Sequence, residues 1–153
     1  MHRVRSNCPV FAALMRKEGG GRRGQRPPWG RETEGAAEKE AARQTIVTAL
    51  NTHDWSGKTR VVRVNGITTE WCVNDLLQVV AGAGHNLDCV MVPKVEDAAT
   101  LHFVDHLLTY LEREHGIDHR IGIEAQIESA RGTFNLREIA TATPRIETLI
   151  FGP

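Results

Sequence analysis

Two charged residues in strand-like segments are the strongest candidates for chemistry in this sequence. Arg63 lies in the β-branched run TRVVRVN, residues 59–65, and Glu128 ends the alternating run RIGIEAQIE, residues 120–128. A charged side chain on a strand covered by helices is costly unless it is paired or lines a solvated cavity. Two interpretations stay open: an internal Arg63–Glu128 ion pair, or an anion-binding arginine facing a metal-binding carboxylate.

The alternation of side chains along these strands predicts which polar groups share a face. In the first strand Val61, Arg63 and Asn65 point the same way. In the later strand one face carries Glu124, Gln126 and Glu128, and the opposite face carries Ile121, Ile123 and Ile127. Ligand sites of parallel α/β folds form at the carboxyl ends of the strands, so we expect a site there.

Other candidates are weaker. Lys94 follows Pro93 at a strand end, where it could meet phosphate or carboxylate or be an ordinary surface lysine. His102 and His106 are four residues apart on one predicted helix and could hold a metal, but no third ligand is evident. The sequence contains no P-loop, dinucleotide-binding glycine motif, nucleophile elbow or paired-cysteine metal motif.

Hydrophobic periodicity predicts the elements that position these residues. The expected helices cover residues 36–52, 70–80, 97–115 and 135–140, and the expected strands cover 59–65, 88–95, 120–128 and 147–151. This alternation is typical of α/β folds with a parallel sheet, either open and doubly wound or part of a (β/α)8 barrel. A whole barrel needs about 250 residues, so the 153 residues here could supply about half of one.

Two local patterns refine the expected helices. The apolar stripe of the helix over residues 70–80 is expected to comprise Val73, Leu76, Leu77 and Val80. Asn135, with Glu138 three residues later, resembles a capping box at the start of the last helix.

The first 35 residues differ in composition from the rest of the chain. Residues 1–35 hold eight basic and three acidic side chains, six of the fourteen glycines and three of the six prolines. This composition predicts a disordered basic tail over 1–35 ahead of a folded domain over 36–153. An organelle presequence and a nucleic-acid arm are alternatives, but the absence of interleaved aromatic residues makes nucleic acid an unfavoured partner.

Cysteine content and hydropathy bear on the compartment. The three cysteines are an odd number without paired spacing, and no secretory leader precedes them, which favours reduced thiols and a cytoplasmic protein. No run of about 18 apolar residues is present, so we expect no membrane-spanning helix.

Three stretches resemble the citrate lyase beta-subunit-like CoA ester lyases, which include malyl-CoA and methylmalyl-CoA lyases within the HpcH/HpaI aldolase group. They are EKEAARQTIVTALNTHDWSGKTRVVRVNG, LDCVMVPKVEDAA and RIGIEAQIESARGTFNLREIATATPRIETLIFGP. The resemblance covers about residues 34–153. It implies a partial (β/α)8 TIM barrel, with about four parallel strands and intervening helices.

The resemblance also implies residue roles. The arginine of the family's R-V-N-G motif grips the substrate carboxylate and falls on Arg63. The glutamate of the I-E-S/T-A motif is a Mg²⁺ ligand and falls on Glu128. The V-P-K-V-E segment borders the site, which implies weaker roles for Lys94 in substrate binding and for Glu96.

The implied activity is a Mg²⁺-dependent aldol or Claisen cleavage of a malyl-CoA or citramalyl-CoA-like 3-hydroxyacyl-CoA thioester. The partners would be the CoA thioester and a small oxo-acid or aldehyde, in a homo-oligomer. Mg²⁺ would act as a Lewis acid while Arg63 held the carboxylate through a two-pronged hydrogen bond.

Two departures from the family pattern lead to a further expectation. The family opens with a strand ending in a D-L-E-D-type motif, where this chain has Glu34-Gly35-Ala36-Ala37. It continues F-G-P-x-D, in which the aspartate is a second Mg²⁺ ligand, whereas this sequence stops at Pro153. We therefore expect impaired lyase activity in this chain. The alternative is a non-catalytic fragment that binds CoA or an oligomeric partner through exposed sheet edges.

Overall fold

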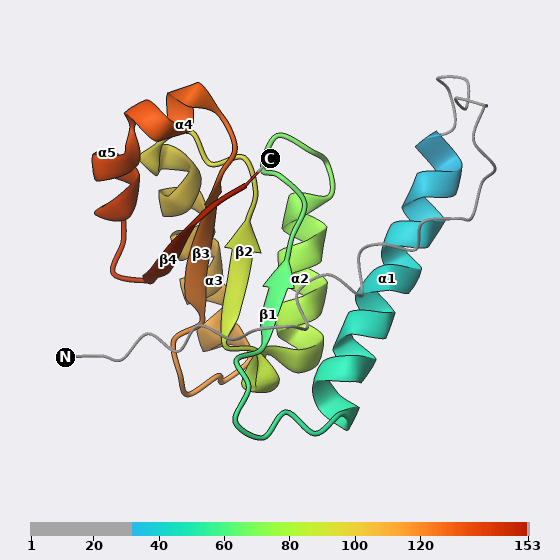
Figure 1. Cartoon of the computed structure of the whole chain (residues 1–153). Coiled ribbons are helices and arrows are strands. Elements are labelled where there is room, and N and C mark those ends of the chain that lie inside the picture. The colour runs from blue at the N-terminus through green and yellow to red at the C-terminus, as the bar shows by residue number, and fades with distance from the viewer. Residues whose placement is uncertain (1–31, 153) are drawn as a thin grey trace.

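The computed structural model describes residues 32–152, which form a four-stranded parallel sheet with helices packed against it (Figure 1). The strands follow one another across the sheet in the order β1-β2-β3-β4. They are β1 (Val61–Arg63), β2 (Cys89–Val92), β3 (Gly122–Ile127) and β4 (Ile146–Phe151). The helices are α1 (Glu32–Thr52), α2 (Cys72–Ala83), α3 (Ala98–Glu114), α4 (Ala130–Phe134) and α5 (Leu136–Ala140), with a 3₁₀ turn η1 (Gly84–Asn86).

This arrangement is the expected partial (β/α)8 barrel, because all strand pairs are parallel and the strands lie in chain order, whereas a doubly wound sheet reverses its order. The disordered basic tail expected over residues 1–35 falls largely outside the described residues, and α1 begins at Glu32. Within residues 32–152 no helix is long and apolar enough to cross a bilayer.

The main hydrophobic core lies between the sheet and its helices. Ile123, Ala125 and Ile127 of β3 belong to this core, so the predicted apolar face of that strand is confirmed. In register across the sheet, Arg63 is paired with Met91 and Met91 with Glu124. These three residues therefore share the opposite face, which would be the inner wall of a barrel.

The predicted apolar stripe of α2 is confirmed at Leu76 and Val80 and wrong at Val73 and Leu77. Val73 and Leu77 are 40% and 36% exposed. The buried positions are Cys72, Asp75, Leu76, Val79, Val80 and Ala83. The buried face of the helix is centred closer to Asp75 than predicted. The reason is that Asp75 is buried against α1, where its Oδ1 accepts a hydrogen bond from Arg43 Nε at 2.8 Å.

The C-terminal helices also differ from the prediction. Helix α4, which the periodicity did not indicate, begins after Ser129, whose hydroxyl accepts a hydrogen bond from Gly132 N at 3.1 Å. Asn135 precedes α5 without a side-chain capping bond, so the predicted capping box is wrong. Its amide instead donates to Glu96 O at 2.8 Å, which ties these helices to the loop after β2.

A buried arginine secures the amino end of the last strand. The Arg145 side chain is 4% exposed and pairs with Asp105 and Glu112 of α3. It also donates to Ile121 O at 2.9 Å and to Thr109 Oγ1 at 2.8 Å. The cluster joins α3 to the β3–β4 edge at the end of the sheet opposite Arg63, where barrel residues serve stability.

We predict that Arg145→Gln lowers the free energy of unfolding by about 3–5 kcal/mol, because two carboxylates would lose their buried cation. Urea denaturation followed by circular dichroism measures the change. Arg137, an exposed arginine of α5, gives the matched control Arg137→Gln, which should shift stability by less than about 0.5 kcal/mol. Equal effects of the two substitutions would contradict this role.

The ion pairs of Arg60 with Asp88 and of Arg145 with Asp105 predict that the stability of the fold is sensitive to acid. Burial alone would raise the pKa of Asp88 and of Asp105, but hydrogen bonds from Arg60 to Asp88, and from Thr143 and Arg145 to Asp105, lower both pKa values overall. A carboxylate whose pKa is lowered in the folded state stabilises the fold above its ordinary pKa of about 3.9. This stabilisation is lost as the pH falls below that value. Urea midpoints should therefore drop between about pH 5 and pH 3. A flat profile over that interval would contradict the assignment.

Candidate active site

Arg63 and Glu128 meet at the carboxyl edge of the sheet. Arg63 is the last residue of β1 and Glu128 follows β3 directly. Arg63 Nη2 lies 3.4 Å from Glu128 Oε1, so the two side chains reach each other across β2. The arginine side chain is 41% exposed and that of the glutamate 11%.

This ion pair is weak by its geometry. An exposed pair contributes about 0–1 kcal/mol, and a separation of 3.4 Å lies at the long end for a charge-assisted hydrogen bond. Within residues 38–152 it is the one polar contact of the Arg63 guanidinium. Within this range, most donors of the guanidinium have no acceptor.

Lys94 lies at the same edge, after β2, and is exposed. It has a left-handed backbone conformation with φ of 53°. The following residue, Val95, donates its N–H to Gln126 O at 3.0 Å, which fixes the loop against β3. In the described part of the chain Lys94 makes no ion pair with Glu128. The carboxylate of Glu96, in the same loop, lies with its Oε2 3.9 Å from Arg131 Nη1.

A buried polar network supports the end of β1. Asp75 Oδ2 accepts hydrogen bonds from the Asn65 backbone at 2.8 Å and from its side chain at 2.6 Å, while Oδ1 accepts from Arg43. Lys39 Nζ donates to Asn65 Oδ1 at 2.8 Å. Asp75 therefore connects α1, α2 and the segment two residues beyond Arg63.

Sequence reasoning missed Lys39, Arg43 and Asp75 as parts of this arrangement. The available signal was the spacing of Lys39 and Arg43, which are four residues apart and so share a face of α1. Asp75 offered a second signal, because it is flanked in helical projection by apolar residues of α2.

The donor groups near Glu128 suit a hard cation. Gln126 lies two residues earlier on the same face, and its Oε1 is buried without a hydrogen-bond partner. Mg²⁺ prefers oxygen ligands and is often held by one or two carboxylates, with water and substrate completing the shell. Among residues 38–152 there is no cluster of three or more His, Cys, Asp or Glu side chains. The residues present therefore fit a loosely held Mg²⁺ with one protein carboxylate.

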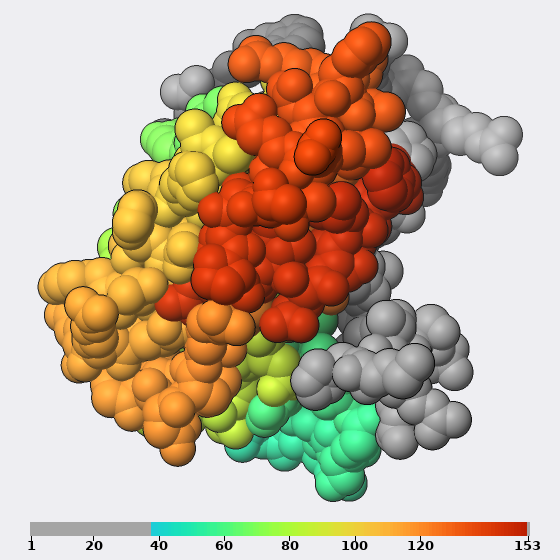
Figure 2. Space-filling view, turned by 90° about the vertical axis from the view of Figure 1, so that its left-hand side faces the viewer, coloured from blue at the N-terminus to red at the C-terminus, as the bar shows by residue number. Residues whose placement is uncertain are grey.

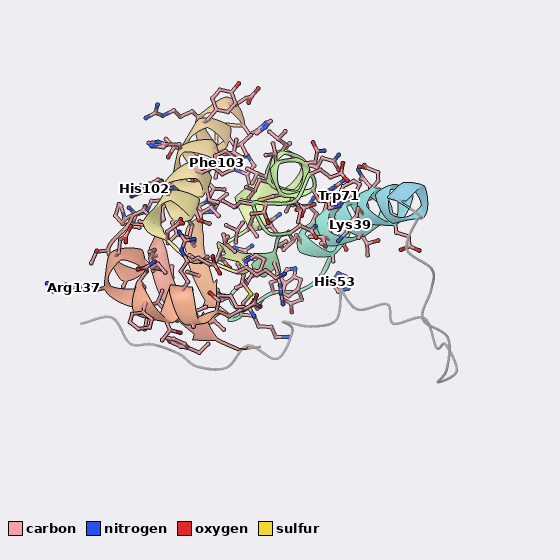
Figure 3. The ribbon with its side chains drawn as sticks, turned by 90° about the horizontal axis from the view of Figure 1, so that it is seen from above. Lys39, His53, Trp71, His102, Phe103 and Arg137 are labelled. Atoms are coloured by element: carbon pink, nitrogen blue, oxygen red, sulfur yellow. The ribbon has the colours of Figure 1, made fainter. Side chains whose placement is uncertain are left out.

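Other groups can be assigned by their surroundings. Burial raises the pKa of the Cys72 thiol to about 11 and that of Cys89 to about 12, so both thiols are protonated and poor nucleophiles at neutral pH. Burial, and then the charge of Glu147, raise the pKa of Glu124. His102 lies on the outside of α3 beside Phe103 (Figure 3), and its Nε2 contacts Ala142 O at 2.9 Å.

Comparisons with known proteins identify the family of the chain. The profile described as "HpcH/HpaI aldolase/citrate lyase" matches residues 32–153. The chain belongs to the HpcH/HpaI aldolase/citrate lyase family. The resemblance drawn from its motifs is thus confirmed, and with it the assignment to a family of CoA ester lyases.

Two curated relatives show the extent of the match. The malyl-CoA/beta-methylmalyl-CoA/citramalyl-CoA lyase of Chloroflexus aurantiacus is 41% identical over 115 residues, which are 75% of this chain and 33% of the relative. The citrate lyase subunit beta of Leuconostoc mesenteroides subsp. cremoris is 39% identical over 113 residues, which are 72% of this chain and 36% of that protein. The chain therefore spans about a third of the length of these relatives.

Solved structures agree on the fold. RipC from Yersinia pestis is 30% identical with a TM-score of 0.58, over 76% of this chain and 46% of its own. A citrate lyase from Burkholderia xenovorans has a TM-score of 0.67 at 17% identity, over 82% of this chain and 37% of its own. At that identity the second likeness supports the fold alone.

The network around Asp75 yields a stability prediction. Asp75→Asn should lower the free energy of unfolding by about 3–5 kcal/mol, because the buried Arg43 guanidinium would keep only its contact to the half-exposed Glu40. Both side chains of this pair are less than a tenth exposed. Urea denaturation measures the change, and Asp118→Asn, at a side chain 93% exposed, is the matched control. A loss below about 1 kcal/mol at Asp75 would contradict the role given to this pair.

Proposed function

We propose that this chain carries part of the active site of a Mg²⁺-dependent carbon–carbon lyase for a malyl-CoA or citramalyl-CoA-like thioester. The observation that carries the proposal is the approach of Arg63 to Glu128 at the carboxyl edge of the sheet. Family membership and the relatives named for malyl-CoA, citramalyl-CoA and citrate cleavage support the same chemistry.

In this proposal Arg63 binds the carboxylate of the acid portion of the substrate. Arg63 is the last residue of β1, and among residues 38–152 its guanidinium makes one long contact, to Glu128. A planar guanidinium can hold a carboxylate through two parallel hydrogen bonds, which a lysine ammonium cannot reproduce. Lys94, exposed at the same edge, is proposed to bind a second anionic group of the thioester.

Glu128 is proposed to hold Mg²⁺, with Gln126 Oε1 as a neighbouring oxygen donor. The ion, when bound, would polarise the oxygens of the acid and stabilise the negative charge that develops as the carbon–carbon bond breaks. In that reaction the hydroxyl loses its proton and becomes the carbonyl of the small oxo-acid. The bonding electrons pass to the carbon next to the thioester carbonyl, and the enolate formed there takes up a proton to give the acyl-CoA.

We further propose that the isolated chain is impaired. Glu128 is the one carboxylate that this proposal gives to the metal, and the described residues hold no group of three or more His, Cys, Asp or Glu that could bind it, so most of its shell would be water and its affinity weak. Cleavage of malyl-CoA should therefore run well below the roughly 1–1000 per second typical of enzymes. A rate within that range would contradict the impairment.

The assay follows acyl-CoA release from malyl-CoA by the purified chain, with Mg²⁺ and with EDTA. Turnover should require Mg²⁺ and be lost in Glu128→Gln, while Glu138→Gln, at an exposed glutamate of α5, should leave it unchanged. Full turnover in Glu128→Gln would exclude the metal assignment. No turnover under any condition, together with retained CoA binding, would favour the alternative of a non-catalytic binding fragment.

Substitution of the arginine tests substrate binding separately. Arg63→Lys should reduce kcat/KM about 10- to 100-fold, the equivalent of one lost charge-assisted hydrogen bond. Arg137→Lys is the matched control on a side chain that points away from the body of the protein (Figure 3). Unchanged kcat/KM in Arg63→Lys would refute carboxylate binding by Arg63.

Lys94 permits a substitution that removes the ammonium without straining the backbone. Because its φ is 53°, Lys94→Gly should keep or raise the urea midpoint, since glycine adopts this conformation without a steric penalty. If the ammonium binds the thioester, KM for malyl-CoA should rise several-fold in the same variant. An unchanged KM would remove Lys94 from the site.

A further inference from the structure

We propose that Asn135 is a positioning residue, which holds the loop after β2 in a strained conformation and so directs the Lys94 ammonium toward the anionic part of the substrate. This role rests on the binding of the thioester by Lys94 in the proposed function. The loop comprises residues 93–97, between β2 and α3. Asn135 lies between α4 and α5, 39 positions after the loop residue that it contacts.

Lys94 has a backbone conformation that its residue type disfavours. Among residues 32–152 it is the one residue other than glycine with a positive φ, 53°. The left-handed region is unfavourable for a residue with a Cβ, so such a residue persists where the surrounding contacts impose the conformation. Its neighbours Pro93 and Val95 are buried, whereas Lys94 is exposed. The reversal of the chain therefore leaves the lysine side chain outside while the residues on either side stay packed.

Hydrogen bonds hold the main chain at the two residues directly after Lys94. Val95 N donates to Gln126 O of β3 at 3.0 Å, and Asn135 Nδ2 donates to Glu96 O at 2.8 Å. On the other side of Lys94, the chain belongs to β2, which is paired with β3 up to its last residue. Rotation about φ of Lys94 would swing one side of the loop against the other and break these bonds.

Helix α4 packs against the same loop. A Cβ at Gly132 would lie 2.5 Å from Val95 O, so this close approach requires glycine. Gly132 N donates to the hydroxyl of Ser129, which directly follows Glu128 in the chain. Helix α4 lies beyond the carboxyl ends of the strands (Figure 1), and the orange atoms of α4 and α5 adjoin the yellow atoms of the segment that leads into α3 (Figure 2). These contacts set the position of Lys94 relative to Glu128.

The side chain of Asn135 serves the loop instead of its own helix. Asparagine before the first turn of a helix usually accepts a hydrogen bond from the helix backbone, which stabilises the helix. Asn135 precedes α5 but makes no such bond. Its amide group instead bonds to the Glu96 carbonyl, two residues beyond Lys94. The contact thus supports the conformation of the loop rather than the start of α5.

NMR of the full chain without ligand tests the effect on the loop. A positive φ brings the amide and α protons of a residue close together, so Lys94 should show a strong NOE between them. This NOE should weaken in Asn135→Ala, and also in Gly132→Ala, whose Cβ would push against Val95 O. Asn74→Ala, at an exposed asparagine of α2, is the matched control and should leave it unchanged. An unchanged NOE in both loop variants would overturn the positioning role without bearing on thioester binding by Lys94.

Calorimetric titration of the same proteins with CoA, whose phosphates supply the anionic group, tests the effect on binding. Lys94→Gly and Asn135→Ala should each weaken CoA binding several-fold. The double variant should bind CoA no more weakly than Lys94→Gly alone, because Asn135 would act through Lys94. Asn135→Ala changes no charge, so its effect cannot come from a change in net charge.

The outcomes separate the two proposals. Losses of CoA affinity that multiply in the double variant, or an unchanged affinity in Asn135→Ala beside a weakened Lys94→Gly, would overturn positioning by Asn135 and leave Lys94 in the site. An unchanged affinity in Lys94→Gly, or no CoA binding by the unaltered chain, would refute the binding role of Lys94 and the positioning role with it. Circular dichroism verifies that each variant is folded.

Discussion

The contact between Arg63 and Glu128 joins the ends of two strands that are separated by a third. It is long, partly exposed and contributes little to stability. The cost of placing these two charges on the inner face of the sheet is therefore not offset by a strong internal pair. A weak contact suits a site in which each group exchanges its partner, the arginine for a carboxylate and the glutamate for a cation.

The two ends of the sheet are stabilised differently. At the amino end, Arg145 is fully hydrogen-bonded to α3 and to the β3–β4 edge, and such saturated clusters leave nothing for a ligand to bind. At the carboxyl end, the Asp75 network fixes the backbone beyond Arg63, and within residues 38–152 the guanidinium itself makes only the long contact to Glu128. The fold thus combines a rigid base with available functional groups, the usual division in barrels.

Much of this arrangement could be predicted from local sequence. Alternation along β3 was enough to place Glu124, Gln126 and Glu128 on the face opposite Ile123, because a strand has a period of two. The α2 stripe could not be placed correctly, because the rotation of that helix depends on the Asp75–Arg43 pair, which forms between segments 32 residues apart. Helix α4 was missed for a similar reason: it is one short turn that depends on a single serine cap.

The contact at the candidate site was predictable in part. Motif spacing identified Arg63 and Glu128, and their separation of 65 residues in sequence is bridged by two parallel crossovers. The supporting side chains Lys39, Arg43 and Asp75 lie on helices, where spacing and apolar neighbours give only a weak signal that separates a buried polar residue from a solvated one. Only packing decides that difference.

Paramagnetic broadening by Mn²⁺, used as a Mg²⁺ analogue, tests the central claim most directly. In NMR spectra of the full chain, resonances of Glu128, Gln126 and the Arg63 side chain should broaden first, and a small oxo-acid such as glyoxylate should strengthen the effect. Broadening centred on His102 and His106 of α3, or an unselective loss of signal that the oxo-acid does not change, would contradict a shared metal and carboxylate site at this edge.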